Sequence, residues 1–151
     1  MSDLRELYQE VIFDHYRQPR NRGVLPHANH SAEGYNPLCG DRVTLYLIIE
    51  DGVVKDARFE GSGCAIATAS ASMMTEALKG RTEAQVRALF ERFHEGVTTP
   101  PDVPLSVDPA LGKLETLLGV REFPARIKCA TLAWHTLLAA LQDERGTVST
   151  E

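Results

Sequence analysis

Apolar and polar residues alternate most regularly between residues 43 and 60. Valine, leucine or isoleucine stands at every second position from 43 to 49, and the alternation returns at Ala57 and Phe59 after Asp51-Gly52. This period of two is typical of half-buried strands, and Asp-Gly is a preferred two-residue hairpin turn. The pattern therefore predicts a β-hairpin. A third strand at 32–36 is expected to pair with it, because a sheet of two strands alone is only marginally stable.

Apolar residues at three- and four-residue steps predict helices in most of the remaining chain. The expected helices cover residues 3–17, 65–79, 82–94, 108–119 and a last helix from near 124. Thr82 with Gln85 offers a capping box, and three prolines predict an extended surface loop at 97–108. A polar tail is expected at 147–151. The predicted fold class is α+β: one domain over 1–151, with a small antiparallel sheet of about three strands and helices packed on one face.

Composition is that of an ordinary soluble domain. The chain has 151 residues, of which 43% are hydrophobic and 25% charged, with a formal net charge of -5. No concentrated basic patch indicates a nucleic-acid surface, no apolar run approaches a membrane span, and the start of the chain has no signal-peptide pattern. Three cysteines without an export signal argue against a disulfide framework. We therefore expect a cytoplasmic protein that binds neither nucleic acid nor membrane.

Each of the three cysteines lies where a turn meets a regular element. They occur in the segments 36–41, 61–64 and 126–129. The first two segments flank the predicted hairpin, whose two-residue turn brings those strand ends together. Cys64 falls in the first turn of a helix, where free N–H groups and the helix dipole stabilise negative charge. Cys129, in the second turn of the last helix, can face the same end, so we interpret the three segments as one site.

Cys39, Asp41, Cys64 and Cys129 form a plausible set of four metal ligands. Zinc takes tetrahedral thiolate, imidazole and carboxylate ligands, and thiolates also hold iron–sulfur clusters, so these residues suit either occupant. A closed structural zinc site is usually built from cysteine and histidine. One carboxylate among three thiolates is a harder and more exchangeable ligand, which favours a site that exchanges its ligands or transfers what it binds.

A purely structural interpretation of the thiols is the main alternative to a metal site. Free cysteines are often small core residues, and no pair here has the Cys-x-x-Cys spacing. Gly40 and Gly63 favour the metal site, because glycine beside a cysteine permits a sharp turn or a close approach. His15 and the Met73-Met74 pair also carry donor atoms, but each fits a packed core position better than a ligand.

Three segments together carry a resemblance to a known family. Cys39-Gly40-Asp41, the segment 61–65 and the segment 126–134, in this order after an amphipathic helix, resemble the U-type iron–sulfur assembly proteins, and more narrowly their SufU branch. The resemblance covers nearly the whole chain. Lys128, where IscU proteins have histidine, and the separation of 65 residues between Cys64 and Cys129 (129 minus 64) favour SufU. The segment 94–119 matches the insertion expected of that branch.

The resemblance implies a function and a role for each site residue. SufU-like proteins bind zinc through the positions of Cys39, Asp41, Cys64 and Cys129, and they receive persulfide sulfur from a pyridoxal-phosphate cysteine desulfurase of the SufS type. A desulfurase histidine is thought to replace Cys39 on the zinc, which frees Cys39 as the acceptor thiolate. The sulfur then passes to a downstream iron–sulfur scaffold or apo-protein. Arg126 matches a position that supports the site or the partner, and it equally fits a solvent-facing place. The role is that of a sulfurtransferase-like acceptor working with the desulfurase, not of a stand-alone catalyst.

Two other functions stay open on the sequence. The same ligands suit a scaffold that assembles and transfers a [2Fe–2S] cluster, although the absence of histidine at position 128 counts against it. A structural zinc module is the lesser alternative, because such a site is not expected to use an aspartate. A deaminase-type zinc hydrolase would need a His-x-Glu and a Pro-Cys-x-x-Cys segment, and the sequence has neither.

Overall fold

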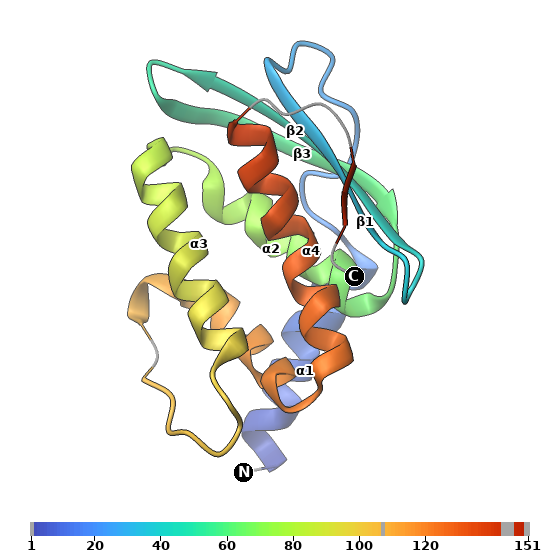
Figure 1. Cartoon of the computed structure of the whole chain (residues 1–151), viewed down its shortest axis with the longest axis vertical. Helices are drawn as coiled ribbons and strands as arrows, with labels where there is room; N and C mark the ends of the chain where they lie inside the picture. The colour runs from blue at the N-terminus through green and yellow to red at the C-terminus, as the bar shows by residue number, and fades with distance from the viewer. Residues whose placement is uncertain (1, 107, 143–146, 150–151) are drawn as a thin grey trace.

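A four-stranded sheet forms one layer of the molecule. The computed structural model describes residues 2–106, 108–142 and 147–149 (Figure 1). The strand order is β3-β2-β1-β4, in which β1, β2 and β3 are antiparallel and β4 is parallel to β1. The strands are β1 (His30–Asn36), β2 (Asp41–Glu50), β3 (Val53–Ser62) and β4 (Thr147–Ser149). The predicted antiparallel sheet of three strands is confirmed, and a short fourth strand extends its edge.

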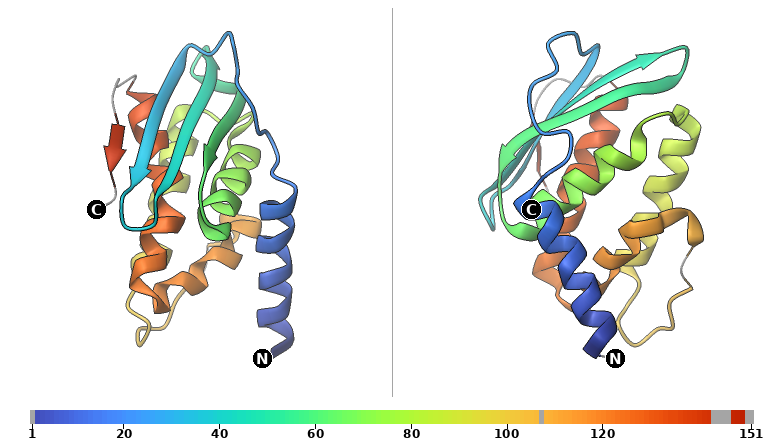
Figure 2. Two further views of the ribbon diagram at one scale, coloured as in Figure 1. Left: turned by 90° about the vertical axis from the view of Figure 1, so that its right-hand side faces the viewer. Right: turned by 180° about the vertical axis from the view of Figure 1, so that it is seen from behind.

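The helices gather on one side of the sheet, as predicted (Figures 1 and 2). They are α1 (Ser2–Arg17), α2 (Ala65–Leu78), α3 (Glu83–Thr98), the 3-10 helix η1 (Pro109–Glu122) and α4 (Pro124–Leu141). Helix α4 lies against β1 and β2, and α2 lies against β3. The others form a second tier, in which α3 packs on η1 and α4, and α1 packs on α2 and η1. Among the described residues, no helix is long and apolar enough to cross a membrane.

The hairpin follows directly from its sequence. Leu45 pairs with Phe59 and Leu47 with Ala57, and all four side chains are buried on the face that the helices cover. The turn residues Asp51 and Gly52 have φ angles of 53° and 73°, and two positive φ angles are what the favoured two-residue hairpin turn requires. The turn, together with a one-residue register shift between Ile48 and Ile49, sets the pairing that puts the start of β2 beside the end of β3.

Small residues let α2 lie close beneath the sheet. Ala69, Ser70 and Ala71 are buried. Ser70 accepts a hydrogen bond from Trp134 Nε1 at 3.1 Å and donates one to the Ala130 carbonyl at 2.6 Å, so it ties α2 to α4. Because side chains of this size keep the helix axes near one another, the first turns of both helices are held at one end of the sheet.

Three element boundaries differ from the sequence prediction. Helix α3 continues past His94 to Thr98, because the buried Gly96 lets it pass directly over Leu118. The expected short helix at 108–119 is a 3-10 segment that runs to Glu122, with a non-helical Gly112 inside it. Residues 147–149 of the predicted polar tail form β4. Three residues are too few to show an alternation of apolar and polar positions in the sequence. They form a strand because the free edge of β1 pairs with them. Residues 150–151 of that tail lie outside the described part of the chain.

Candidate metal centre

Two segments that are far apart in the sequence meet at the end of the sheet where β1 turns into β2. Cys39 lies on that turn, Asp41 begins β2, and Cys129 lies in α4. The Sγ atoms of Cys39 and Cys129 are 3.4 Å apart. Cys39, Asp41 and Cys129 each offer a ligand atom, and these atoms lie within 4.8 Å of one another. Three of the four predicted ligands are thus close enough to share one ion.

The fourth predicted ligand, Cys64, joins this group through Asp41. Asp41 is 1% exposed, and its Oδ1 accepts the backbone N–H of Cys64 at 2.9 Å. Its Oδ2 lies 3.8 Å from Cys64 Sγ. Cys64 is the N-cap of α2, one position before the first helical residue, and its sulfur accepts the N–H of Ala67 at 3.4 Å. The aspartate therefore holds the start of α2 against the start of β2.

Two glycines allow this close approach. A Cβ on Gly63 would lie 2.9 Å from Asp41 Oδ1. A Cβ on Gly61 would lie 2.1 Å from the Arg42 carbonyl oxygen, and the φ of Gly61 is +143°. The segment that leads into Cys64 can therefore pass next to the aspartate only without side chains at these positions.

The cysteines differ sharply in exposure. Cys39 is exposed, Cys64 is half-buried, and Cys129 is only 3% exposed. Burial, together with the neighbouring Cys39 and Cys64 sulfurs and the Asp41 carboxylate, raises the pKa of the Cys129 thiol far above its ordinary value. Thiols and a carboxylate crowded into so small a space would repel one another as anions, which favours a cation among them, and the exposed Cys39 is the one that an incoming molecule can reach.

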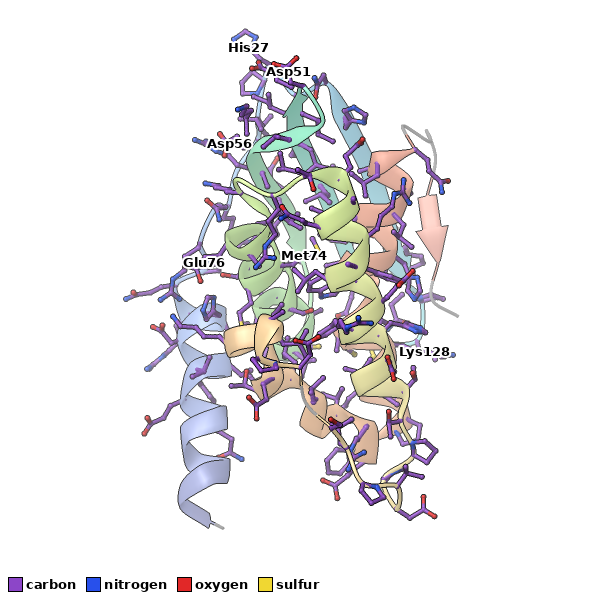
Figure 3. The ribbon with its side chains drawn as sticks, turned by 90° about the vertical axis from the view of Figure 1, so that its left-hand side faces the viewer. His27, Asp51, Asp56, Met74, Glu76 and Lys128 are labelled. Atoms are coloured by element: carbon purple, nitrogen blue, oxygen red, sulfur yellow. The ribbon has the colours of Figure 1, made fainter. Side chains whose placement is uncertain are left out.

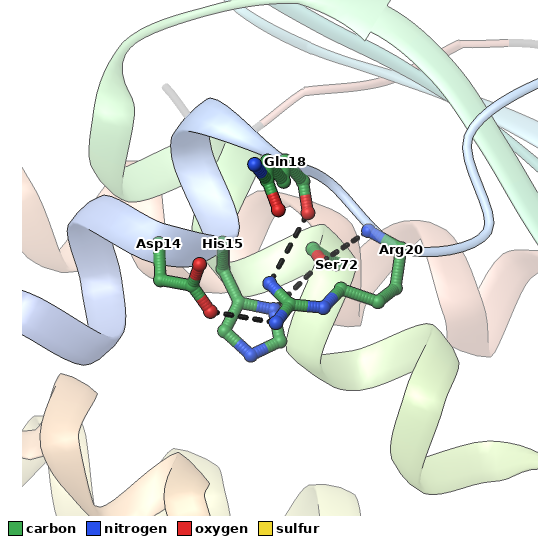
Figure 4. Close-up of polar contacts among 5 residues, drawn as sticks. All are labelled: Asp14, His15, Gln18, Arg20 and Ser72. Carbon is green, nitrogen blue, oxygen red and sulfur yellow. Dashed lines mark hydrogen bonds and ion pairs between the residues drawn. The ribbon is translucent and has the colours of Figure 1, made fainter.

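The other residues considered in the sequence analysis lie outside this group of four. His15 is 1% exposed in α1, and its Nδ1 lies 2.7 Å from Ser72 Oγ on α2, so it is a packed residue as expected (Figure 4). Met74 is fully buried in the core, whereas Lys128 on α4 is half-buried (Figure 3). Arg126 is exposed in the first turn of α4.

Asn36 begins the segment 36–41 of the expected site, but the sequence analysis gave its side chain no role there. Its side chain is fully buried, and its Nδ2 lies 4.0 Å from Cys129 Sγ. The sequence carries one signal that could have identified Asn36. Ala32, Gly34 and Asn36 occupy alternate positions of the predicted strand, so the asparagine falls on the face that the helices cover, where a polar side chain needs a specific partner.

Comparisons with known proteins place the chain in a family. The family model described as NifU-like N terminal domain matches residues 7–130. The zinc-dependent sulfurtransferase SufU of Bacillus subtilis is 45% identical over 150 residues, which cover 96% of each chain. The iron–sulfur cluster assembly scaffold protein IscU of Thermotoga maritima is 42% identical over 137 residues, covering 90% of this chain and 93% of its own.

A solved structure is similar over most of its length. It is the crystal structure of a proposed iron–sulfur cluster assembly scaffold protein for the SUF system from Fervidobacterium islandicum. It superposes with a TM-score of 0.80 at 32% identity, covering 87% of this chain and 94% of the other.

Proposed function

Because the chain belongs to the family of NifU-like N-terminal domains, we propose that it works in iron–sulfur cluster biogenesis as a zinc-binding sulfur acceptor. Cys39 takes persulfide sulfur from a pyridoxal-phosphate cysteine desulfurase of the SufS type and passes it to a downstream scaffold or apo-protein. The observation that carries this proposal is the exposed Cys39 Sγ, 3.4 Å from the buried Cys129 Sγ, on a turn beside Asp41. The zinc-dependent sulfurtransferase of Bacillus subtilis, 45% identical to this chain, supports it.

The donors present fit zinc. Cys39, Asp41, Cys64 and Cys129 would hold the ion, and three sulfurs with one carboxylate oxygen make a four-donor set of the kind that zinc accepts. When bound, zinc supplies the positive charge that keeps these cysteines as thiolates. Asp41 also positions another ligand, because the hydrogen bond that it accepts from the Cys64 N–H keeps the Cys64 sulfur in place.

The sulfur transfer needs no oxidant or reductant. The Cys39 thiolate attacks the outer sulfur of the protonated desulfurase persulfide, and a bond forms between Cys39 Sγ and that sulfur. The sulfur–sulfur bond of the desulfurase breaks, and its cysteine leaves as a thiolate. The proton stays on the transferred sulfur, so Cys39 ends as a persulfide. Of the three cysteines, Cys39 is the exposed one, and its sulfur can therefore meet that of a partner protein.

A [2Fe–2S] scaffold on the same ligands is the second candidate. The 42% identity to the scaffold protein of Thermotoga maritima favours it. Position 128 weighs against it, because Lys128 offers no imidazole where IscU proteins carry histidine.

The proposed function is tested by the turnover rate of a SufS-type desulfurase with and without this protein. The protein is purified with its native metal, and the reductant is too weak to remove persulfide by itself. We expect strong stimulation that disappears with Cys39→Ala, while far-UV circular dichroism shows an unchanged fold. Stimulation that survives in Cys39→Ala would refute the acceptor role. A protein that does not stimulate but assembles and releases a cluster would be the scaffold instead.

A further inference from the structure

Asn36 lies between the exposed and the buried cysteine. It is the last residue of β1, and its side chain is 0% exposed. Its Oδ1 accepts the N–H of Leu38 at 3.2 Å, and its main-chain oxygen accepts the N–H groups of Cys39 at 3.3 Å and Gly40 at 2.8 Å. This one residue therefore shapes the turn that carries Cys39.

The side-chain amide of Asn36 points its NH₂ group at Cys129. A buried amide needs partners for its donor as well as its acceptor. Among the described residues, Nδ2 meets Cys129 Sγ at 4.0 Å, which is the outer limit of an N–H···S contact. The NH₂ group is thus directed at a sulfur that, at 3% exposure, has little access to water.

We propose that Asn36 is a positioning residue of the metal centre, which donates to the Cys129 sulfur and so makes Cys129 the retained ligand while Cys39 exchanges. Hydrogen bonds to a ligand sulfur stabilise its negative charge and fix its orientation. Water can supply such bonds to the exposed Cys39, but the buried Cys129 depends on a protein donor. This inference rests on the proposed zinc site.

The first test replaces the donor and keeps the turn. In Asn36→Asp, a carboxylate oxygen can still accept from Leu38 N–H, but the NH₂ group is lost and a negative charge is added beside the sulfur. We expect zinc affinity, measured by competition with a chromogenic chelator, to fall by roughly 10- to 100-fold, as for other residues that orient metal ligands. An affinity equal to that of the wild type would overturn the proposal.

Asn29→Asp is the matched control. Asn29 Nδ2 donates to the Ile49 carbonyl at 2.8 Å and its Oδ1 accepts Ile49 N–H at 2.9 Å, so the same exchange removes one donor and adds one charge at the opposite end of β2. We expect its zinc affinity to match that of the wild type. An equal loss in both variants would overturn the proposal, because charge alone would then explain the effect.

A double-mutant cycle with Cys39→Ala identifies the ligand through which Asn36 acts. If Asn36 acts on Cys129, then Asn36→Asp weakens zinc binding by the same factor with or without Cys39. If the loss vanishes in the Cys39→Ala background, then Asn36 acts through the turn alone, and the proposal fails.

A measurement on the wild type keeps the proposal testable even if Asn36→Asp does not fold. With ¹⁵N-labelled asparagine and ¹¹³Cd in place of zinc, we expect the Asn36 side-chain N–H resonance to shift on metal binding and to couple to the cadmium through the sulfur. No shift and no coupling would overturn the proposal.

Sulfur transfer is measured separately. A protein that binds zinc without stimulating the desulfurase would refute the acceptor function, while these affinity measurements would still decide the role of Asn36.

Discussion

At the scale of single residues, the contact between Gly63 and Asp41 makes the candidate site sensitive to one methyl group. A Cβ at Gly63 would lie 2.9 Å from Asp41 Oδ1 and 3.2 Å from its Cγ. We expect Gly63→Ala to displace the carboxylate from the Cys64 N–H and to lower the free energy of unfolding by about 1–3 kcal/mol, as overpacking usually does. Zinc affinity is expected to fall with it, and both quantities are measured on the same preparation.

Gly119→Ala is the control for this substitution. A Cβ at Gly119 would meet no heavy atom within 4 Å, so the change adds a methyl group without a clash. We expect its zinc affinity to equal that of the wild type. If Gly63→Ala also bound zinc normally, then the position of the Asp41 carboxylate would not matter for the ion.

We expect the stability of the fold to depend on pH through His15. Its Nδ1 lies within hydrogen-bonding distance of Ser72 Oγ, at 2.7 Å, and the same hydroxyl accepts the N–H of Arg20 at 2.8 Å (Figure 4). The Nε2 atom is buried without a partner among the described residues. Burial first, and then the positive charge of Arg20, lower the pKa of His15. The negative charge of Glu76 opposes them less strongly, and the effects of Lys113, which lowers this pKa, and Asp14, which raises it, are smaller still.

The sign of this pH dependence follows from the lowered pKa. Below the unfolded-state value of about 6.5, the unfolded chain binds a proton at this residue that the folded chain resists. The contribution of His15 is therefore fully present above pH ~6.5 and is lost as the pH falls from there towards the folded pKa. We expect His15→Asn to flatten the slope of unfolding free energy against pH in this range, measured by urea denaturation of the metal-free protein. An unchanged slope would show that His15 is not buried in its neutral form.

At the scale of elements, the cap of α3 acts on stability alone. Thr82 Oγ1 accepts the N–H of Gln85 at 3.2 Å, and the Gln85 side chain accepts the N–H of Thr82 at 2.9 Å. We expect Thr82→Ala to lower the free energy of unfolding by about 1 kcal/mol without changing zinc affinity. In the control Thr98→Ala, the lost hydroxyl bonds, within the described part of the chain, only carbonyls of its own helix, so the effect should stay within about 0.5 kcal/mol. Equal losses in the two variants would contradict the capping role.

The elements that could be predicted are those in which local pattern and tertiary packing agree. The hairpin has both alternation and the Asp-Gly turn, and α3 has its capping box, so each was found at its start. Boundaries set by distant contacts were missed. The extension of α3 depends on Leu118 packing over Gly96, and β4 depends on the open edge of β1. Neither partner can be read from the segment itself.

The candidate site, too, could be predicted from the sequence only in part. Its four proposed ligands carry recognisable chemistry and sit in motifs that resemble a family, so the sequence was enough to name them. Asn36 has no metal-binding chemistry of its own. Its interest comes from 0% exposure and from the direction of its amide towards Cys129, which lies 93 residues further along the chain. Such a contact exists only after the strand and the helix have packed.

At the scale of the whole molecule, the candidate site joins parts of the chain that are far apart in sequence. The turn after β1, the cap of α2 and the second turn of α4 meet at one end of the sheet, while α3 and η1 pack elsewhere on the helical layer (Figure 1). An ion bound to all three segments would hold the sheet and both inner helices together in the folded state. Binding to the folded chain and global stability are therefore linked.

This linkage gives the last prediction. An ion that binds the folded chain stabilises it by about 2.7 kcal/mol when its free concentration is 100 times the dissociation constant, less any affinity for the unfolded cysteines. We expect chelation to lower the thermal midpoint and added zinc to restore it as concentration rises, measured by circular dichroism. Cys129→Ala should lose most of this response, because it removes the buried ligand in α4. Cys39→Ala should keep more of it, because Asp41, Cys64 and Cys129 still tie β2, α2 and α4 together. If zinc stabilised Cys129→Ala as much as the wild type, then the ion would not bind where these three segments meet.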